Sequence, residues 1–322
     1  MMNPMVSVVM ITYGHEKFIV DAVKGVFFQD YNGPIELIIA NDKSPDDTDL
    51  VLTTFLENTI IPEHIQVDYI CHDSNKGMKE NFSWALKRAS GKYIAICEGD
   101  DFWTSPLKLQ KQVDFLESNP DFSLCFTNVS TQNASGEIIK ERSIPESRYD
   151  KDVFTQDDMV IFAPTLSRVF KNVIDKDSTL TFSGDSMQLV FLSTFGKIKY
   201  LDIVTGVYRI HAGGVWSMQS ELKQKFMFTN SRIDCLQIIN VKNQHRFLRD
   251  ILKNFWYLKC IHTEESTKVL VDLITKYNSA QVNYSFLNNI KRRCAMKIIK
   301  TIEVDSKSFT YKLIKKLILK LF

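Results

Sequence analysis

The sequence predicts an α/β fold that begins with a parallel sheet and ends in a helical region. Short apolar, β-branched runs alternate with segments of helical periodicity four times in the first hundred residues, which indicates parallel strands joined by helices. From about residue 219 onward, strand signals vanish and helical patterns dominate. The length of 322 residues suits one large domain with an accessory segment.

The expected elements follow in chain order. Val6–Tyr13 has no helical period and is expected to be a strand buried on both faces. The other early strands are expected at 35–40, 67–71 and 92–97, and the helices between strands at 16–29, 44–58 and 78–89. A helix over 105–118, a strand over 122–129, a polar connection over 131–152 and helical stretches around 157–196, interrupted at 182–185, complete the pattern.

Polar residues follow three of the predicted strands. Tyr13-Gly14-His15, Asn41-Asp42 and the run from Glu98 to Asp101 each stand where a strand ends. The carboxyl ends of parallel strands meet at one edge of a sheet, and ligands of such sheets bind there. The sequence therefore predicts a ligand site at this edge.

Asp100 and Asp101 form an adjacent pair of carboxylates in the last of these runs. Adjacent carboxylates repel one another unless a cation lies between them, so the pair favours a hard divalent ion with oxygen ligands. An Asp that caps the helix after Ser105 is the competing interpretation. By themselves, the two residues leave both readings open.

A series of motifs resembles the family 2 glycosyltransferases, which share the GT-A fold. The resemblance covers about residues 5 to 216, and its motifs occur in the family's order. They are Ser7–Tyr13, Gln29 with Tyr31, Ile38–Asp42, Asp46–Thr48, Asn75–Gly77, Asn81, Ala89–Ile94, Glu98–Trp103 and Pro106–Gln110. The resemblance implies a Rossmann-like mixed sheet with helices on both faces.

The same resemblance implies a binding site for a nucleotide sugar, with a UDP-sugar as the expected donor. Asp42 would accept a hydrogen bond from the uracil N–H, Tyr13 would pack on the base, and Asp100 would lie near the ribose. The residues expected to bind the nucleotide sugar are Thr12, Tyr13, Glu16, Asp42, Lys76, Asp100 and Trp216. Glu98 stands where the family usually has Asp, which leaves its contact undecided.

The resemblance also implies a Mn²⁺ or Mg²⁺ ion held by Asp101, with His211 completing its shell or binding phosphate. The run Tyr208 to His211, with Gly213-Gly214-Val215-Trp216, resembles the segment that closes over the donor diphosphate. The other five histidines have no comparable context in the sequence, and none forms a metal-spaced pair. They are therefore expected to be structural.

Asp185 is expected to be the catalytic base of an inverting transfer, which needs one carboxylate to deprotonate the acceptor hydroxyl. It stands before a predicted helix at the family's usual distance past the metal motif, where capping is the competing reading. Asp175 and Asp177 are nearby alternatives in a polar turn. The loop 163–166 resembles the one that faces the acceptor.

The resemblance and the helical pattern together predict the domain organisation. Residues 1–218 form the GT-A catalytic domain, with a nucleotide-binding half over 1–103 and an acceptor half over 104–218. Residues 219–322 form a helical region whose apolar faces pack either internally or across a homodimer. The basic tail 309–322 has an amphipathic pattern that favours contact with an anionic membrane surface over packing on protein.

Charge and composition exclude several classes. The net charge is +2, and from residue 291 onward ten Lys or Arg face only Glu303 and Asp305, so no basic stripe for nucleic acid crosses the body. The 6 cysteines lack CxxC spacing, and no secretion signal or membrane-spanning stretch is seen. We therefore expect a cytoplasmic protein, associated with the inner face of the cell membrane through its tail.

The predicted function is transfer of a sugar from a nucleotide sugar to a carbohydrate or lipid-linked saccharide in polysaccharide biosynthesis of the capsule or O-antigen kind. A retaining enzyme on the same fold is a near alternative. A nucleotidyltransferase would need a Gly-rich, basic phosphate loop after the first strand, and Thr12 to Glu16 offers none. A non-catalytic carbohydrate-binding protein on a GT-A scaffold would not need Asp42, Asp100, Asp101 and Asp185.

Overall fold

A computed structural model describes residues 3–158, 161–175, 182, 184–214, 219–240, 243–261 and 263–280. Trp216 and the basic tail 309–322 lie outside the described residues. The chain divides into two compact units. The first is built from the residues up to Thr155 and the segments that begin at Ile161 and Phe195, and the second from the segments that begin at Gln156, Ser183 and Gln219.

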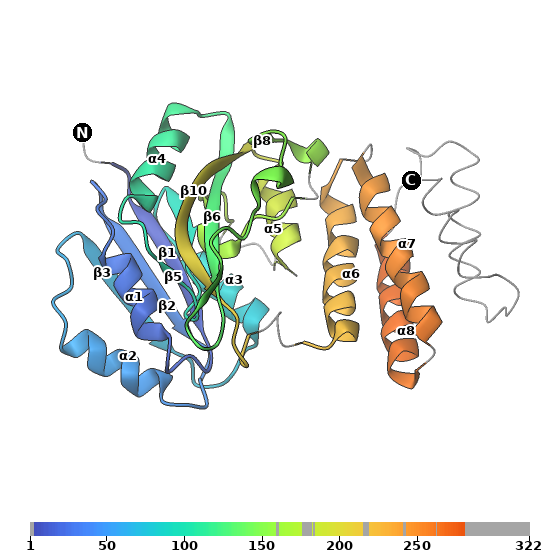
Figure 1. The fold of residues 1–322 in the computed structure, drawn as a ribbon, viewed down its shortest axis with the longest axis horizontal. Helices are drawn as coiled ribbons and strands as arrows, with labels where there is room; N and C mark the ends of the chain where they lie inside the picture. Colours follow the sequence, from blue (N-terminus) through green and yellow to red (C-terminus); the bar gives the residue numbers. More distant parts are fainter. Residues whose placement is uncertain are drawn as a thin grey trace, which may run out of the picture. The chain divides into compact units, whose positions relative to one another are not determined.

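The first unit is organised around one ten-stranded sheet with the order β3-β2-β1-β4-β9-β6-β10-β5, in which β7 also pairs with β6 and β8 with β10 (Figure 1). The strands are β1 (Val6–Thr12), β2 (Ile35–Asn41), β3 (Ile65–Cys71), β4 (Tyr93–Ile96), β5 (Phe102–Trp103), β6 (Phe122–Gln132), β7 (Ile138–Lys140), β8 (Val153–Phe154), β9 (Val169–Lys171) and β10 (Lys197–Arg209).

The sheet is mixed. Strands β1 to β4 run parallel, as the alternation of strands and helices predicts. Strand β9 is antiparallel to both β4 and β6, and β10 is again parallel to β6. The expectation of only helical stretches around 157–196 is therefore wrong at β9, and the polar connection over 131–152 contains β7. These short strands contain too few residues to show a period, and pairing with longer neighbours determines them.

The helices of the first unit cover both faces of the sheet. They are α1 (Ile19–Phe27), α2 (Thr48–Glu57), α3 (Met78–Arg88) and α4 (Lys108–Ser118), and the short 3₁₀ helices are η1 (Glu146–Arg148) and η3 (Thr165–Ser167). Helices α1, α2 and α4 share one apolar core with Val6, Val8 and Met10 of β1. Helix α3 packs on β1 and β2 from the opposite face, since its crossover returns in the opposite direction along the strand order.

The second unit is helical. It contains η2 (Gln156–Asp158), α5 (Asp185–Leu192), α6 (Glu221–Ile238), α7 (Gln244–Ile261) and α8 (Glu264–Ser279). Helices α6, α7 and α8 pack together around buried side chains such as Ile233, Phe255 and Leu273. The helical pattern predicted from residue 219 is confirmed as far as the described residues reach. None of the described helices combines the length and apolar character needed to cross a bilayer.

Candidate functional site

Three strands of the first unit point their carboxyl ends at the same edge of the sheet. Strand β1 is parallel to β4, two antiparallel steps lead from β4 through β9 to β6, and β10 is parallel to β6. Strands β1, β4 and β10 therefore run in one direction. The short strand β5 follows β4 directly and pairs with β10, with Phe102 opposite Val207, which draws the acidic run 98–101 to the end of β10.

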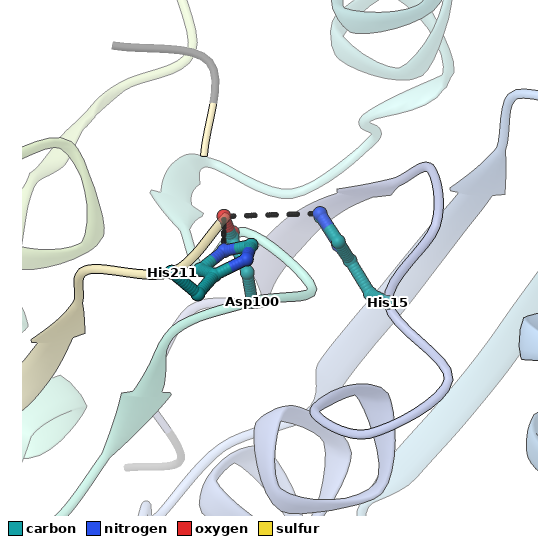
Figure 2. Close-up of side chains that lie close together, drawn as sticks. All are labelled: His15, Asp100 and His211. Atoms are coloured by element: carbon teal, nitrogen blue, oxygen red, sulfur yellow. Dashed lines mark hydrogen bonds and ion pairs between the residues drawn. The ribbon is translucent and has the colours of Figure 1, made fainter. Parts of the chain in front are cut away.

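His15, Asp100 and His211 converge at this edge, and each follows one of the three strands within four residues (Figure 2). Nε2 of His211 lies 3.0 Å from Oδ2 of Asp100, and Nε2 of His15 lies 3.7 Å from the same oxygen. One ligand atom from each residue lies within 4.8 Å of the others. In the part of the chain that the structure describes, this is the one group of three or more such side chains that could hold a metal ion.

The electrostatics of the cluster are those of closely packed, poorly hydrated groups. Burial lowers the pKa of His15 against the opposing effect of the Asp100 charge. Burial would raise the pKa of Asp100, but the hydrogen bond from His211 and the two neighbouring imidazoles hold that pKa below its ordinary value. The cluster thus favours an ionised carboxylate between two imidazoles, and an imidazole must be neutral to bind a metal.

Neighbouring groups orient both rings. The Nδ1 atom of His15 lies 3.1 Å from Oγ1 of Thr12, and Nδ1 of His211 lies 3.2 Å from the Gly213 backbone N–H. Each ring is therefore held at Nδ1 and presents Nε2 to Asp100, an arrangement in which outer contacts aim metal-ligating histidines. A Cβ atom at Gly99 would lie 2.8 Å from Oγ1 of Thr12 and 3.0 Å from Nδ1 of His15, so a side chain here would force Thr12 to move.

The cluster fits a divalent cation. Two imidazole nitrogens and one carboxylate oxygen form a mixed donor set that suits a first-row transition ion such as Mn²⁺ better than Mg²⁺, which prefers oxygen. Three protein ligands also leave coordination positions for the oxygens of a bound ligand. The arrangement can therefore hold a cation and present it to an anionic group.

Asp101, predicted as the metal ligand, lies outside this cluster. Its Oδ1 accepts a hydrogen bond from the Arg209 backbone N–H at 2.8 Å, and the residue is buried. Burial, with the charges of Asp100 and Glu98, raises the pKa of Asp101 well above its ordinary value. Of the two adjacent carboxylates, the structure places Asp100 beside His211 and joins Asp101 to the end of β10.

Asp42 lies buried after β2 and joins the loop that precedes α3. Its two carboxylate oxygens accept hydrogen bonds from the backbone N–H groups of Lys76 at 2.6 Å and Gly77 at 2.9 Å. Gly77 adopts φ 87°, a backbone conformation that favours glycine. The structure thus joins Asp42 to Lys76 through the main chain, while the Lys76 side chain is exposed.

Tyr13 and Glu16 lie in the loop between β1 and α1. The Tyr13 side chain is exposed, as required of a residue that would pack on a base. The Glu16 backbone N–H donates to Asp46, and its carboxylate accepts from the Asp47 N–H at 3.2 Å. These two hydrogen bonds join the loop after β1 to the loop after β2, at the edge of the sheet where both strands end.

Asp185 begins α5 and is exposed, and it belongs to the second unit, whereas the cluster belongs to the first. Its role as a base remains a prediction. Asp175 is exposed, while Asp177 and Trp216 lie outside the described residues. The loop 163–166 is held in the first unit by a hydrogen bond from the Trp103 indole N–H to the Leu166 carbonyl at 2.8 Å.

The sequence analysis assigned His15 to the structural histidines, and that assignment does not fit its place in the cluster. His15 and His211 are 196 positions apart in the chain, so no spacing rule connects them. The available signal was the position of His15 in the polar run that ends the first strand. Strand β10, which was not predicted, is the element that brings His211 to it.

Comparison with known proteins places the chain in a family. The model of the family described as glycosyl transferase family 2 matches residues 7–177, more than half of the chain. An uncharacterized protein of Mycobacterium tuberculosis is 32% identical over 234 residues, covering 69% of this chain. The chain spans 64% of the length of that relative.

Two further proteins resemble the chain over most of its length. The Escherichia coli UDP-Glc:alpha-D-GlcNAc-diphosphoundecaprenol beta-1,3-glucosyltransferase WfaP is 28% identical over 251 residues, covering 76% of this chain and 90% of that protein. Residues 1–349 of Staphylococcus aureus TarS, solved in complex with UDP, superpose with a TM-score of 0.66 at 14% identity, covering 98% of this chain and 91% of that one.

A mannosyltransferase of Pyrobaculum calidifontis, solved with GDP-Man and Mn²⁺, superposes with a TM-score of 0.53 at 14% identity, covering 99% of this chain and 85% of that one. These solved structures bear on the fold, which is the GT-A fold expected from the sequence motifs. The family match extends from β1 through the acidic run to β9. The chain belongs to glycosyl transferase family 2.

Proposed function

We propose that this protein is an inverting glycosyltransferase that transfers a sugar from a UDP-sugar to a saccharide or lipid-linked saccharide during synthesis of a bacterial surface polysaccharide. The observation that carries the proposal is the His15–Asp100–His211 cluster at the carboxyl edge of the sheet in a family 2 chain. A cation site at this edge suits a substrate with a diphosphate.

Two of the compared proteins support the proposal of a uridine nucleotide as the donor. TarS has been solved with UDP and with UDP-GlcNAc, and the E. coli relative is named for UDP-Glc. In the proposed site, the loop after β1 and the Asp42–Gly77 junction bind the nucleoside, with Tyr13 packed on the base. The acidic run 98–101 would then lie next to the ribose and the diphosphate.

His15, Asp100 and His211 would hold Mn²⁺, which supplies electrophilic stabilisation of the negative charge that develops on the departing nucleoside diphosphate. We assign the ligand role to Asp100, and to Asp101 the task of holding the end of β10. Thr12 and Gly213 orient the two imidazoles, so that both rings are directed before the donor binds.

Asp185 is the proposed base. It would accept the proton of the acceptor hydroxyl while that oxygen attacks the anomeric carbon from the face opposite the leaving diphosphate, which inverts the configuration there. Asp185 lies at the start of α5 and is exposed.

The acceptor class is proposed from the E. coli relative, whose printed name specifies a GlcNAc carried by diphosphoundecaprenol. A lipid-linked acceptor would suit an enzyme at the inner face of the cell membrane, where the basic tail 309–322 would bind anionic lipid.

The test is a panel of UDP- and GDP-sugars offered with and without Mn²⁺, read as nucleotide release and as sugar transfer to a short-chain GlcNAc-diphosphate lipid. The variants are Asp100→Asn and His211→Ala, with His64→Ala as the matched control. His64 precedes β3 and its carbonyl accepts from Ile35 at the start of β2, so it lies at the opposite edge of the sheet.

We expect Mn²⁺-dependent transfer from one UDP-sugar, lost in both site variants and retained in the control. Transfer that proceeds equally in EDTA, or that survives both site variants, would contradict the cation site. Failure to bind any nucleotide sugar by a folded wild-type protein would contradict the enzymatic proposal as a whole and favour a carbohydrate-binding role.

A further inference from the structure

The Arg209 guanidinium contacts the segments that hold Asp100 and His211 in the cluster. Arg209 is the last residue of β10, and its side chain is 9% exposed. It donates to Asp21 of α1 at 2.7 Å, to the Asp100 carbonyl at 3.2 Å and to the Gln132 side chain of β6 at 3.2 Å. One buried side chain thus joins α1, the acidic run and the central sheet.

Arg209 contacts the acidic run through its backbone as well. Its N–H donates to the Asp101 carboxylate at 2.8 Å, while its guanidinium donates to the Asp100 carbonyl. The guanidinium carbon also lies 4.2 Å from the centre of the Phe102 ring. Three consecutive residues, 100 to 102, are therefore held against the end of β10 by this one residue.

The two histidines are coupled to the same residue. His211 follows Arg209 by two positions, and its ring packs on Phe18 with the centroids 4.6 Å apart. The Phe18 ring lies 5.1 Å from the Arg209 guanidinium, and the Phe18 backbone N–H donates to the His15 carbonyl at 2.9 Å. A shift of Arg209 would therefore move the supports of all three cluster residues.

The chemistry at this position requires a guanidinium. A planar, delocalised cation can stack on Phe102 while it donates in three directions, whereas a lysine ammonium is a compact point charge on a flexible stem. Asp21 supplies the balancing charge, and its side chain is 52% exposed. Neutralising Asp21 would thus loosen the guanidinium without opening the core.

We infer that Arg209 is a positioning residue that determines the spacing of His15, Asp100 and His211 and thereby the affinity of the site for a divalent cation. It acts through the acidic run and Phe18 and is not itself a ligand. The inference rests on the proposed function, since it presupposes that the cluster binds the cation. It adds that this affinity depends on a residue outside the ligand set and on the Asp21–Arg209 ion pair.

A purely structural role for Arg209 predicts a different pattern. In that case, substitutions would lower the melting temperature, and any protein that still folds would bind the cation normally. A role as a direct nucleotide ligand predicts weaker UDP binding even without metal. The test must therefore measure cation binding, metal-free UDP binding and stability separately.

The experiment measures Mn²⁺ binding to the full chain by the electron paramagnetic resonance signal of free Mn²⁺, with and without UDP. The variants are Arg209→Lys, Asp21→Ala and their combination. Arg88→Lys is the matched control, because Arg88 pairs with Asp68 at 2.7 Å and lies 5.0 Å from the Trp84 ring centre. It reproduces the ion pair and the aromatic contact on α3, away from the cluster.

We expect the Kd for Mn²⁺ to rise about 10- to 100-fold in Arg209→Lys, as for other outer contacts of metal ligands, and by a smaller factor in Asp21→Ala. The combined variant should resemble Arg209→Lys alone, because the two residues act through one contact. Arg88→Lys should bind Mn²⁺ as the wild type does, and UDP affinity in EDTA should be unchanged in every variant.

Three results would overturn the inference, and they are distinguishable. Folded Arg209→Lys and Asp21→Ala that bind Mn²⁺ as tightly as the wild type would remove the positioning role and leave the cation site intact. A wild-type protein that binds no Mn²⁺, with or without UDP, would remove the cation site and the inference with it. Loss of metal-free UDP binding in Arg209→Lys would reassign the residue to the nucleotide.

Discussion

Lys108 is a fully buried lysine for which no ion pair is found among the described residues. Its side chain is fully buried at the start of α4, with Nζ 2.8 Å from the Gln112 side-chain oxygen and 4.2 Å from the Trp103 ring centre. Burial lowers the pKa of Lys108 from 10.5 to about 7. The folded protein therefore holds this amine largely neutral above neutral pH.

The pH dependence of the free energy of unfolding is determined by the number of protons that the folded and the unfolded chain bind at Lys108. Between pH 7 and 10.5 the unfolded chain binds a proton at Lys108 and the folded chain does not, so the free energy of unfolding rises with pH. The destabilising contribution is present in full below pH 7 and vanishes above pH 10.5. One titrating group gives a slope of at most about 1.4 kcal/mol per pH unit, which is about 2 kcal/mol between pH 7 and 9.

Lys108→Met removes this proton linkage. The variant also leaves the Gln112 oxygen without its donor, but that cost does not vary with pH, so it cancels when the two pH values are compared. Urea unfolding of the wild type and the variant at pH 7 and 9, followed by tryptophan fluorescence, gives the comparison. Lys111→Met on the same helix is the control, because Lys111 is exposed.

We expect the wild type and Lys111→Met to gain about 2 kcal/mol more than Lys108→Met between pH 7 and 9. An equal gain in all three proteins would refute the reasoning, because it would mean that Lys108 keeps its proton in the folded state. The absolute stability of Lys108→Met does not enter the comparison.

Three further predictions concern the site. Gly99→Ala would place Cβ 2.8 Å from Thr12 Oγ1 and 3.0 Å from His15 Nδ1, so Mn²⁺ binding measured by calorimetry should weaken about tenfold; unchanged binding would show that the ring need not be held there. Asp42→Asn would present an amide to backbone donors, so UDP affinity should fall at least about tenfold, and equal affinity would remove Asp42 from the nucleotide site. Asp185→Asn should lower transfer at least about 100-fold with UDP binding unchanged, and an active variant would exclude it as the base.

Local periodicity was sufficient to predict the strands and helices of the first hundred residues. The expected strand over Val6–Tyr13 and helix over 78–89 differ from β1 and α3 by one residue at most at either end. Each of these elements carries its own signal, because a buried parallel strand is continuously apolar and a covering helix repeats every 3.6 residues. The helical nature of the region after residue 219 was predictable for the same reason.

The cluster of His15, Asp100 and His211 was only partly predictable. The acidic run and His211 were recognised from sequence motifs, but the ligand role was given to Asp101 and His15 was set aside. Adjacent residues such as Asp100 and Asp101 project in different directions, and the direction depends on the pairing of β5 with β10. The sequence around the two aspartates does not indicate that β5 pairs with β10.

The sequence by itself determined that this chain forms a parallel α/β core with polar residues at one edge, because alternation and apolar periodicity are local properties. Only the tertiary structure decided which polar residues meet. Strand β10 reaches the end of β1 by pairing with β6 and β5, which brings His211 to His15 across 196 positions and buries Arg209 behind them. Such contacts depend on strand order and register, and these are determined by packing between segments that are distant in the chain.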